Sequence, residues 1–128
     1  MISEGIVAFS NLSQTESYNG QDTGKFSVVI TMDDAEAEAL KSLGVNVREY
    51  KNQPQRKFVT KFPGFAILDA EGQPVTYREI PYGSKVKIMW EPGKPHPTYG
   101  IPPYFKKIKV LELADHGDAD GGVDDEDF

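Results

Sequence analysis

Short segments rich in β-branched and aromatic residues recur along the chain at intervals of about ten residues, and turns containing Gly or Pro separate them. Each segment has the length and composition of a β-strand. We expect about five to seven strands, because some of these segments are very short. The candidate segments are residues 5–9, 25–31, 45–50, 56–62, 65–68, 74–79, 85–90 and 104–113. This pattern predicts a mainly β fold, a small antiparallel barrel or sandwich.

Residues 34–43 form the only segment that we expect to be helical. Asp33 can act as the N-cap, and the acidic residues that follow it suit the positive end of the helix dipole. Gly44 suits the position just after the helix, where a left-handed backbone is common. A small barrel or sandwich with one helix is therefore the expected architecture.

Residues 115–128 contain seven acidic residues, no Lys or Arg, and little apolar material. Such a segment cannot bury enough apolar surface to offset the entropy of ordering it. We therefore expect a folded domain at residues 1–114 and a disordered acidic C-terminal tail at residues 115–128.

The net charge of −6 is unevenly distributed along the 128 residues. Residues 1–47 hold seven acidic and two basic residues, whereas residues 48–109 hold 12 basic and five acidic residues. A basic region followed by an acidic tail predicts a polyanionic partner, together with a tail that competes for the same basic surface.

Several classes of function are excluded by what the sequence lacks. The chain has no Cys, which excludes thiol catalysis, disulfide scaffolds and Cys-based zinc sites. No stretch approaches the roughly 20 apolar residues of a membrane span, and the first residues do not resemble a signal peptide. We expect a protein that acts inside the cell and has no membrane partner.

We also expect no enzyme, metal site, cofactor or small-molecule substrate. Residues 20–25 are too short for a phosphate-binding loop and precede a strand, so they are typical of a hairpin loop. His96 and His116 have no partner at ligand spacing. The carboxylates of residues 33–38 are typical of an exposed helix face, and those of Asp69 and Glu71 are typical of a turn.

The second half of the chain combines basic and aromatic residues. Proteins bind single-stranded nucleic acid with a cationic groove for the phosphates and with rings on which bases stack. Tyrosines beside Lys or Arg are the better stacking candidates, because Phe26, Phe58, Phe62, Phe65 and Trp90 are more typical of a core. The candidate DNA-binding residues are Tyr50, Lys51, Arg56, Lys57, Lys61, Tyr77, Arg78, Tyr82, Lys85, Lys87, Tyr99, Tyr104, Lys106, Lys107 and Lys109.

The last five residues predict a second binding function. A terminal ring, a free α-carboxylate and local negative charge can bind a basic, apolar pocket on another protein. A tail that only increases solubility has no need of a final Phe. The candidate protein-binding residues are Asp124, Asp125, Glu126, Asp127 and Phe128.

Four segments resemble those of a known family: residues 124–128, the closing segment 99–113, and residues 64–75 and 83–90. They are similar to segments of the single-stranded-DNA-binding proteins of tailed bacteriophages. Those proteins carry one OB-fold barrel and an acidic C-terminal tail that ends in an aromatic residue. In the usual OB-fold the helix lies between the third and fourth strands, whereas the helix expected here comes earlier.

The resemblance implies a protein of phage DNA replication and recombination that coats single-stranded DNA in the cytoplasm of a bacterial host cell. It further implies that the tail docks onto the replication polymerase or the primase-helicase. The alternative from another class is an acidic adaptor or inhibitor that mimics nucleic acid and occupies a basic protein partner. Retention on single-stranded DNA at low salt separates the two.

Overall fold

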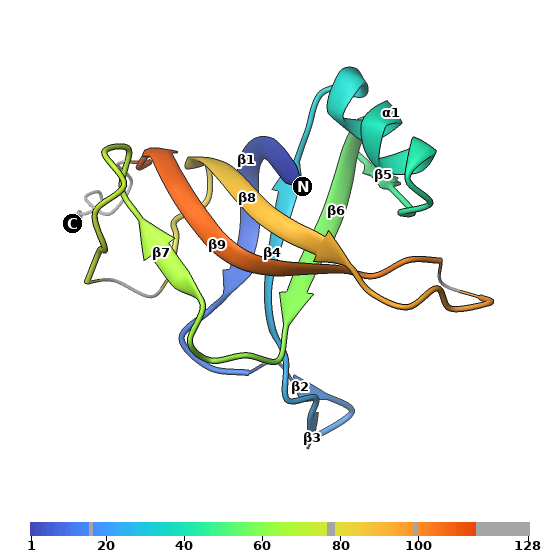
Figure 1. Cartoon of the computed structure of the whole chain (residues 1–128), viewed down its shortest axis with the longest axis horizontal. Coiled ribbons are helices and arrows are strands. Elements are labelled where there is room, and N and C mark those ends of the chain that lie inside the picture. The colour runs from blue at the N-terminus through green and yellow to red at the C-terminus, as the bar shows by residue number, and fades with distance from the viewer. Residues whose placement is uncertain (16, 77–78, 99, 115–128) are drawn as a thin grey trace, which may run out of the picture.

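The computed structural model describes residues 1–15, 17–76, 79–98 and 100–114. Five strands close into a barrel (Figure 1): β1 (Ile2–Asn11), β4 (Phe26–Thr31), β6 (Gln53–Thr60), β8 (Lys85–Pro92) and β9 (Pro103–Glu112). Antiparallel pairing joins β6 to β4, β4 to β1, β1 to β8 and β8 to β9. A parallel contact between Val59 of β6 and Tyr104 of β9 completes the ring. A small five-stranded barrel of this kind is an OB-fold, as expected.

Four further short strands in the described residues are additions to the five-stranded barrel. The hairpin of β2 (Ser17–Tyr18) and β3 (Gln21–Asp22) lies between β1 and β4 in the chain, and it turns at Asn19 and Gly20 with φ of 52° and 79°. β5 (Arg48–Tyr50) pairs with the start of β6, and β7 (Ala66–Leu68) pairs in parallel with β9. Residues 20–25 thus lie in and after a hairpin, as the sequence predicts.

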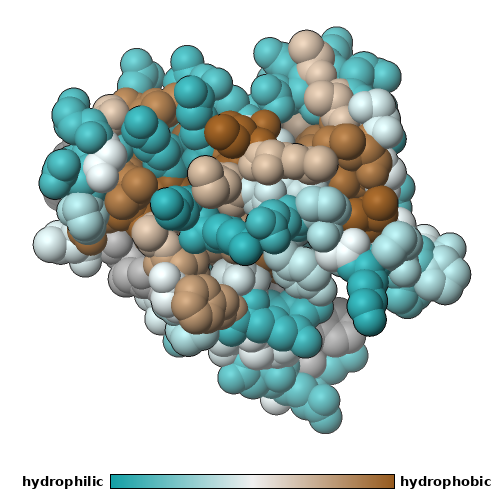
Figure 2. All heavy atoms as spheres, viewed as in Figure 1, coloured by the Kyte–Doolittle hydropathy of each residue, from teal (hydrophilic) through white to brown (hydrophobic). Residues whose placement is uncertain are grey.

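Alternation along the strands separates the core from the surface. In β8, Val86, Ile88 and Trp90 are buried. The Lys85 and Lys87 side chains between them are exposed. Trp90 is 1% exposed, and its indole N–H donates to the Ser3 hydroxyl over 2.9 Å. The core is therefore well packed and has its polar ring nitrogen satisfied. Hydrophobic side chains also reach the surface between hydrophilic ones (Figure 2).

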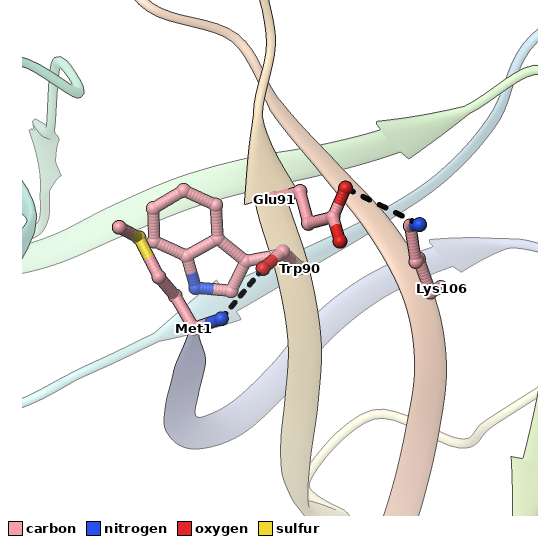
Figure 3. A network of polar contacts seen from close by, with 4 residues as sticks. All are labelled: Met1, Trp90, Glu91 and Lys106. Atoms are coloured by element: carbon pink, nitrogen blue, oxygen red, sulfur yellow. Dashed lines mark hydrogen bonds and ion pairs between the residues drawn. The ribbon is translucent and has the colours of Figure 1, made fainter.

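The first residue extends the ladder between β1 and β8. The Met1 ammonium donates to the Trp90 carbonyl over 2.9 Å, and the Trp90 amide donates to the Met1 carbonyl over 2.8 Å. Figure 3 shows the Met1 ammonium at the Trp90 carbonyl. These two bonds pin the start of the chain to the strand that carries the largest core side chain.

The helix α1 (Asp34–Ser42) has the predicted caps. The Asp33 carboxylate accepts from the Glu36 amide over 2.9 Å, and Gly44 has φ of 89°. However, α1 lies between β4 and β6, the second and third barrel strands. It does not occupy the usual OB-fold position between the third and fourth strands, so here it is an addition to the barrel.

Two expectations for the middle of the chain are wrong. The segment 74–79 forms no strand in its described part, and only an isolated bridge joins Pro74 to Leu68. Phe62 lies beyond the end of β6 and is 66% exposed instead of in the core. Pro63 has no amide hydrogen for a ladder, which favours an end to the strand here. Phe58, Phe65 and Trp90 are buried as expected, and Phe26 is half-buried against them.

Glu79 joins the loop after β1 to the start of the segment leading into β8. Its carboxylate accepts hydrogen bonds from the Ser10 hydroxyl, from the Leu12 amide, and from both the amide and the hydroxyl of Ser13. Partial burial pushes the pKa of Glu79 upward, but these hydrogen bonds outweigh it and hold the pKa below its usual value. The ionised carboxylate therefore stabilises the folded chain.

Glu79→Gln should lower the free energy of unfolding at pH 7, because a neutral amide is a weaker hydrogen-bond acceptor than a carboxylate. The loss should be only about 1 kcal/mol, because Glu79 is exposed to solvent. The folded-state pKa is depressed, so the stabilisation is complete above about pH 4.3, the ordinary pKa of Glu, and is lost as pH falls through the folded value. Urea denaturation at pH 7 and at about pH 3 measures this. The difference from wild type should shrink at low pH, and a pH-independent difference would contradict the assignment. Glu71→Gln, in an exposed turn, is the control.

Candidate nucleic-acid interface

The outer face of the barrel carries a row of side chains that crosses three strands. Phe9 of β1 lies opposite Val29 of β4, and Val29 lies opposite Lys57 of β6. Their neighbours Val28 and Phe58 are fully buried on the inner side. Alternation therefore places Phe9, Val29 and Lys57 together on the outside, across the first three barrel strands.

β5 widens this face. Arg48 lies opposite Gln55 of β6, and Arg48 and Tyr50 are two residues apart on a strand, so they share a face. Together the strands enclose a groove of about 420 Å³. We call it the β4–β6 groove, and it is lined by Ala8, Phe9, Ser27, Val29, Arg48, Tyr50, Gln55, Arg56 and Lys57.

Two aromatic rings in the groove are open to solvent. Phe9 is 60% exposed and Tyr50 is 53% exposed. The Lys51 ammonium lies 5.4 Å from the centre of the Tyr50 ring, in a turn where Lys51 and Asn52 have φ of 52° and 65°. Exposed rings beside a cation are what stacking of nucleobases requires.

Three cations line the groove, Arg48 from β5 and both Arg56 and Lys57 from β6. The Arg56 guanidinium donates to the backbone carbonyls of Asn46, over 3.1 Å, and of Lys57, over 2.9 Å. Burial lowers the pKa of Arg56, but a guanidinium stays charged in proteins. In the described part of the chain Arg48 makes no ion pair. Arg48 and the held Arg56 therefore present positive charge to the groove.

The cationic surface continues into a second hollow of about 380 Å³. It shares Arg48, Arg56 and Lys57 with the groove and adds Asn46, Val47 and Thr98. Thr98 belongs to the proline-rich loop between β8 and β9. No described residue lining either hollow carries a carboxylate. The two hollows thus form one positively charged surface with rings at one end.

A larger hollow of about 560 Å³ has the opposite character. Glu4, Asp33 and Glu36 line it beside Tyr82 and Lys85, and the Lys85 ammonium lies 3.8 Å from a Glu4 carboxylate oxygen. Burial raises the pKa of Glu36, and the charges of Asp33 and Glu4 add to the rise despite a hydrogen bond from the Glu4 backbone. The structure thus places two predicted site residues, Tyr82 and Lys85, among carboxylates that repel phosphate.

The other predicted residues are spread over the molecule. Lys87 and Lys109 lie opposite each other on the outside of β8 and β9, and Lys61 is exposed just after β6. Tyr104, Lys106 and Lys107 line a separate hollow beside β9. The structure therefore brings Tyr50, Arg56 and Lys57 together in the β4–β6 groove, with Lys51 next to Tyr50. It brings Tyr104, Lys106 and Lys107 together in the other hollow. Outside the described residues lie the predicted Tyr77, Arg78, Tyr99, Asp124, Asp125, Glu126, Asp127 and Phe128.

The sequence analysis missed Phe9 and Arg48. Phe9 faces outward because a β-bulge between Val7 and Phe9 inserts one extra residue into β1, which reverses the alternation beyond it. Arg48 reaches the groove through the pairing of β5 with β6. Neither effect leaves a strong local signal, although Arg48 belongs to the same basic region.

Two further features of the described residues concern metal ligands and membrane-spanning helices. Among residues 1–15, 17–76, 79–98 and 100–114, no group of three or more His, Asp or Glu side chains could hold a metal ion. The same part of the chain contains no helix long and apolar enough to cross a membrane.

Comparison with known proteins returns similarity in structure only, since no protein-family model and no curated protein matches the sequence. The single-stranded-DNA-binding protein gp2.5 of bacteriophage T7 superposes with a TM-score of 0.59 at 15% identity, over 97% of each chain. The single-stranded-DNA-binding protein of bacteriophage Enc34, in complex with single-stranded DNA, gives a TM-score of 0.65 at 14% identity, over 88% of this chain and 85% of that one. This chain therefore shares the fold of these two phage proteins.

Proposed function

We propose that this protein binds single-stranded DNA in the β4–β6 groove, coats it without sequence specificity, and catalyses no reaction. The observation that carries the proposal is the composition of the groove, where Phe9 and Tyr50 are open to solvent beside three cations and no carboxylate. In OB-folds the face of the second and third strands binds oligonucleotides. The groove lies on that face.

The rings and the cations of the groove have different roles in the proposed binding. Phe9 and Tyr50 supply rings for stacking, which tolerates any base because every base has a π-face. Arg48, Arg56 and Lys57 supply charge for the phosphates, so affinity should depend on salt. Bases in a duplex are already stacked and paired, so a duplex must open before its bases can stack on the rings. The bases of a single strand can stack on them directly. The similarity in fold to the single-stranded-DNA-binding proteins of bacteriophages T7 and Enc34 supports the same function.

Titration of full-length protein against single-stranded and duplex DNA of the same sequence tests this function. We expect clear preference for the single strand, with log affinity falling against log salt at a slope near −0.7 per neutralised phosphate. Equal affinity for the duplex, or affinity that does not change with salt, would contradict the proposal. Absence of any retention at low salt would favour the acidic adaptor that binds a basic protein.

Tyr50→Ala should weaken binding of single-stranded DNA by about 1–3 kcal/mol, the typical loss for one stacked base. Thermal unfolding should change little, because Tyr50 is 53% exposed on an edge strand. Fluorescence anisotropy with a labelled oligonucleotide measures the affinity.

Tyr82→Ala is the matched control for Tyr50→Ala. It removes a tyrosine that is 71% exposed but lies beside Glu4, Asp33 and Glu36. We expect its affinity to equal that of wild type. If Tyr82→Ala weakens binding and Tyr50→Ala does not, the strand follows the other side of the barrel.

We further propose that the protein serves DNA replication and recombination in the cytoplasm of a bacterial host cell. In this proposal, residues 124–128 recruit the replication polymerase or the primase-helicase. Support comes from the four consecutive acids followed by Phe128, which suit a basic pocket with an apolar floor.

Phe128→Ala should abolish binding to the purified replication polymerase or primase-helicase and leave affinity for single-stranded DNA unchanged, because the ring is needed for docking and not for stacking. Surface-immobilised partner and labelled DNA measure the two separately. Equal partner binding by both forms would overturn the assignment of the ring, and a matching loss of DNA affinity would place Phe128 in the DNA site instead.

A further inference from the structure

A further hollow on the barrel, like the β4–β6 groove, is lined by aromatic rings and basic side chains and by no carboxylate. We propose that the cleft between Phe62 and Tyr104 is a second base-stacking subsite for the strand of DNA held in that groove. This inference rests on the proposed function. It joins three residues of the sequence-based DNA-binding list, Tyr104, Lys106 and Lys107, to Phe62, which the sequence analysis assigned to the core.

The cleft lies where the barrel closes. β6 ends at Thr60, next to the parallel contact of Val59 with Tyr104, and β7 then pairs with β9 further along. A hollow of about 430 Å³ opens at this junction. We call it the Phe62 cleft, and it is lined by Thr60, Phe62, Gly64, Ala66, Tyr104, Phe105, Lys106 and Lys107.

The Phe62 ring has the properties of a stacking platform. It is 66% exposed, more than the rings of Phe9 and Tyr50. A Cβ placed on Gly64 would lie 2.7 Å from the ring, so the ring rests directly on the Gly64 backbone. The Phe62 amide also donates to the Thr60 hydroxyl over 3.2 Å, which fixes the turn that carries the ring. One side of the ring is thus supported, and a large part of it is open to a ligand.

Tyr104 forms the other side of the cleft. Its ring is half-buried and rests on Gly93, where an added Cβ would clash with a carbon of the Tyr104 ring. Glycine at this position therefore allows the close approach of backbone and ring. A supported tyrosine and an exposed phenylalanine that line one hollow provide two rings and a polar hydroxyl, which suit a nucleobase.

The charge of the Phe62 cleft matches a nucleic-acid backbone. Lys106 and Lys107 line it, and no described residue that lines it carries a carboxylate. Lys107 makes no ion pair with the described residues. The Lys106 ammonium lies 3.2 Å from a Glu91 oxygen (Figure 3), but both side chains are more than half exposed. Such a pair is weak, so a phosphate can compete for Lys106.

Continuity along β6 connects the two sites. The β4–β6 groove ends at Lys57, and the Phe62 cleft begins at Thr60, three residues or about 10 Å further along the same strand. The acidic hollow beside Tyr82 is the one described hollow of the four with carboxylates in its lining. The acidic hollow includes Gln53 at the start of β6, so a strand that leaves the groove toward Thr60 and the Phe62 cleft runs away from those carboxylates.

Phe62→Trp in the full-length chain gives a direct readout. Trp90 is the only native tryptophan and is 1% exposed, so its emission should respond little to DNA. The introduced indole should be quenched when an oligonucleotide of about 16 nucleotides binds, the upper end of what one OB-fold covers. Its affinity should equal or exceed that of wild type, because indole also stacks on bases.

Phe62→Ala should weaken binding of the same oligonucleotide by about tenfold, which corresponds to about 1.4 kcal/mol for one stacked base. Leu113→Ala is the control, because Leu113 is 51% exposed and lines neither site. Gly64→Ala keeps the ring but forces it to shift, so it should also weaken binding. Thermal unfolding of each variant reports on the fold.

The outcomes separate this inference from the proposed function. If wild type does not bind single-stranded DNA, the proposed function itself fails. If wild type binds and Tyr50→Ala weakens binding, but Phe62→Ala binds as wild type and the introduced indole is not quenched, only the second subsite is overturned. A change in sedimentation of the DNA-free Phe62→Ala protein would assign the Phe62 cleft to contacts between copies of the chain and would also overturn it.

Discussion

Closure of the sheet between β6 and β9 is the constraint on which the rest of the structure depends. A single parallel pairing, Val59 with Tyr104, joins the third barrel strand to the fifth. Closure gives every strand one inner and one outer side, so Val28, Phe58 and Ile88 meet in a fully buried interior while their neighbours in sequence face outward. The β4–β6 groove and the Phe62 cleft both include residues of β6, the strand that closes the barrel with β9.

The outer surface is divided electrostatically. Arg48, Arg56 and Lys57 line the β4–β6 groove, whereas Glu4 and Glu36 line a separate hollow near the start of α1. A polyanion is attracted to the first region and repelled from the second, which restricts its path over the barrel. Net charge alone would have suggested that the whole molecule repels DNA, since the chain carries −6. The local arrangement of charge, and not the total, decides what the surface can bind.

Local features of the backbone position the exposed aromatic rings. The bulge in β1 turns Phe9 outward, and Gly64 and Gly93 let the rings of Phe62 and Tyr104 rest on bare backbone. The turn at Lys51 and Asn52 brings an ammonium over Tyr50. In each case a local change of backbone aims a side chain that would otherwise have no defined direction. Pre-positioned rings lose less entropy when a base stacks on them.

Local sequence patterns were enough to predict most strand segments, the capped helix and a mainly β barrel or sandwich, because alternation, caps and turn residues act over a few neighbours. They also located the basic and aromatic region that supplies Tyr50, Arg56 and Lys57. Which of these residues meet depends on the fold, since strand register and the β1 bulge set the face of each side chain. The fold moved Phe62 from the expected core to the surface, placed Tyr82 among carboxylates, and inserted α1 between the second and third barrel strands. Those outcomes depend on pairings between residues far apart in the chain, which no local pattern encodes.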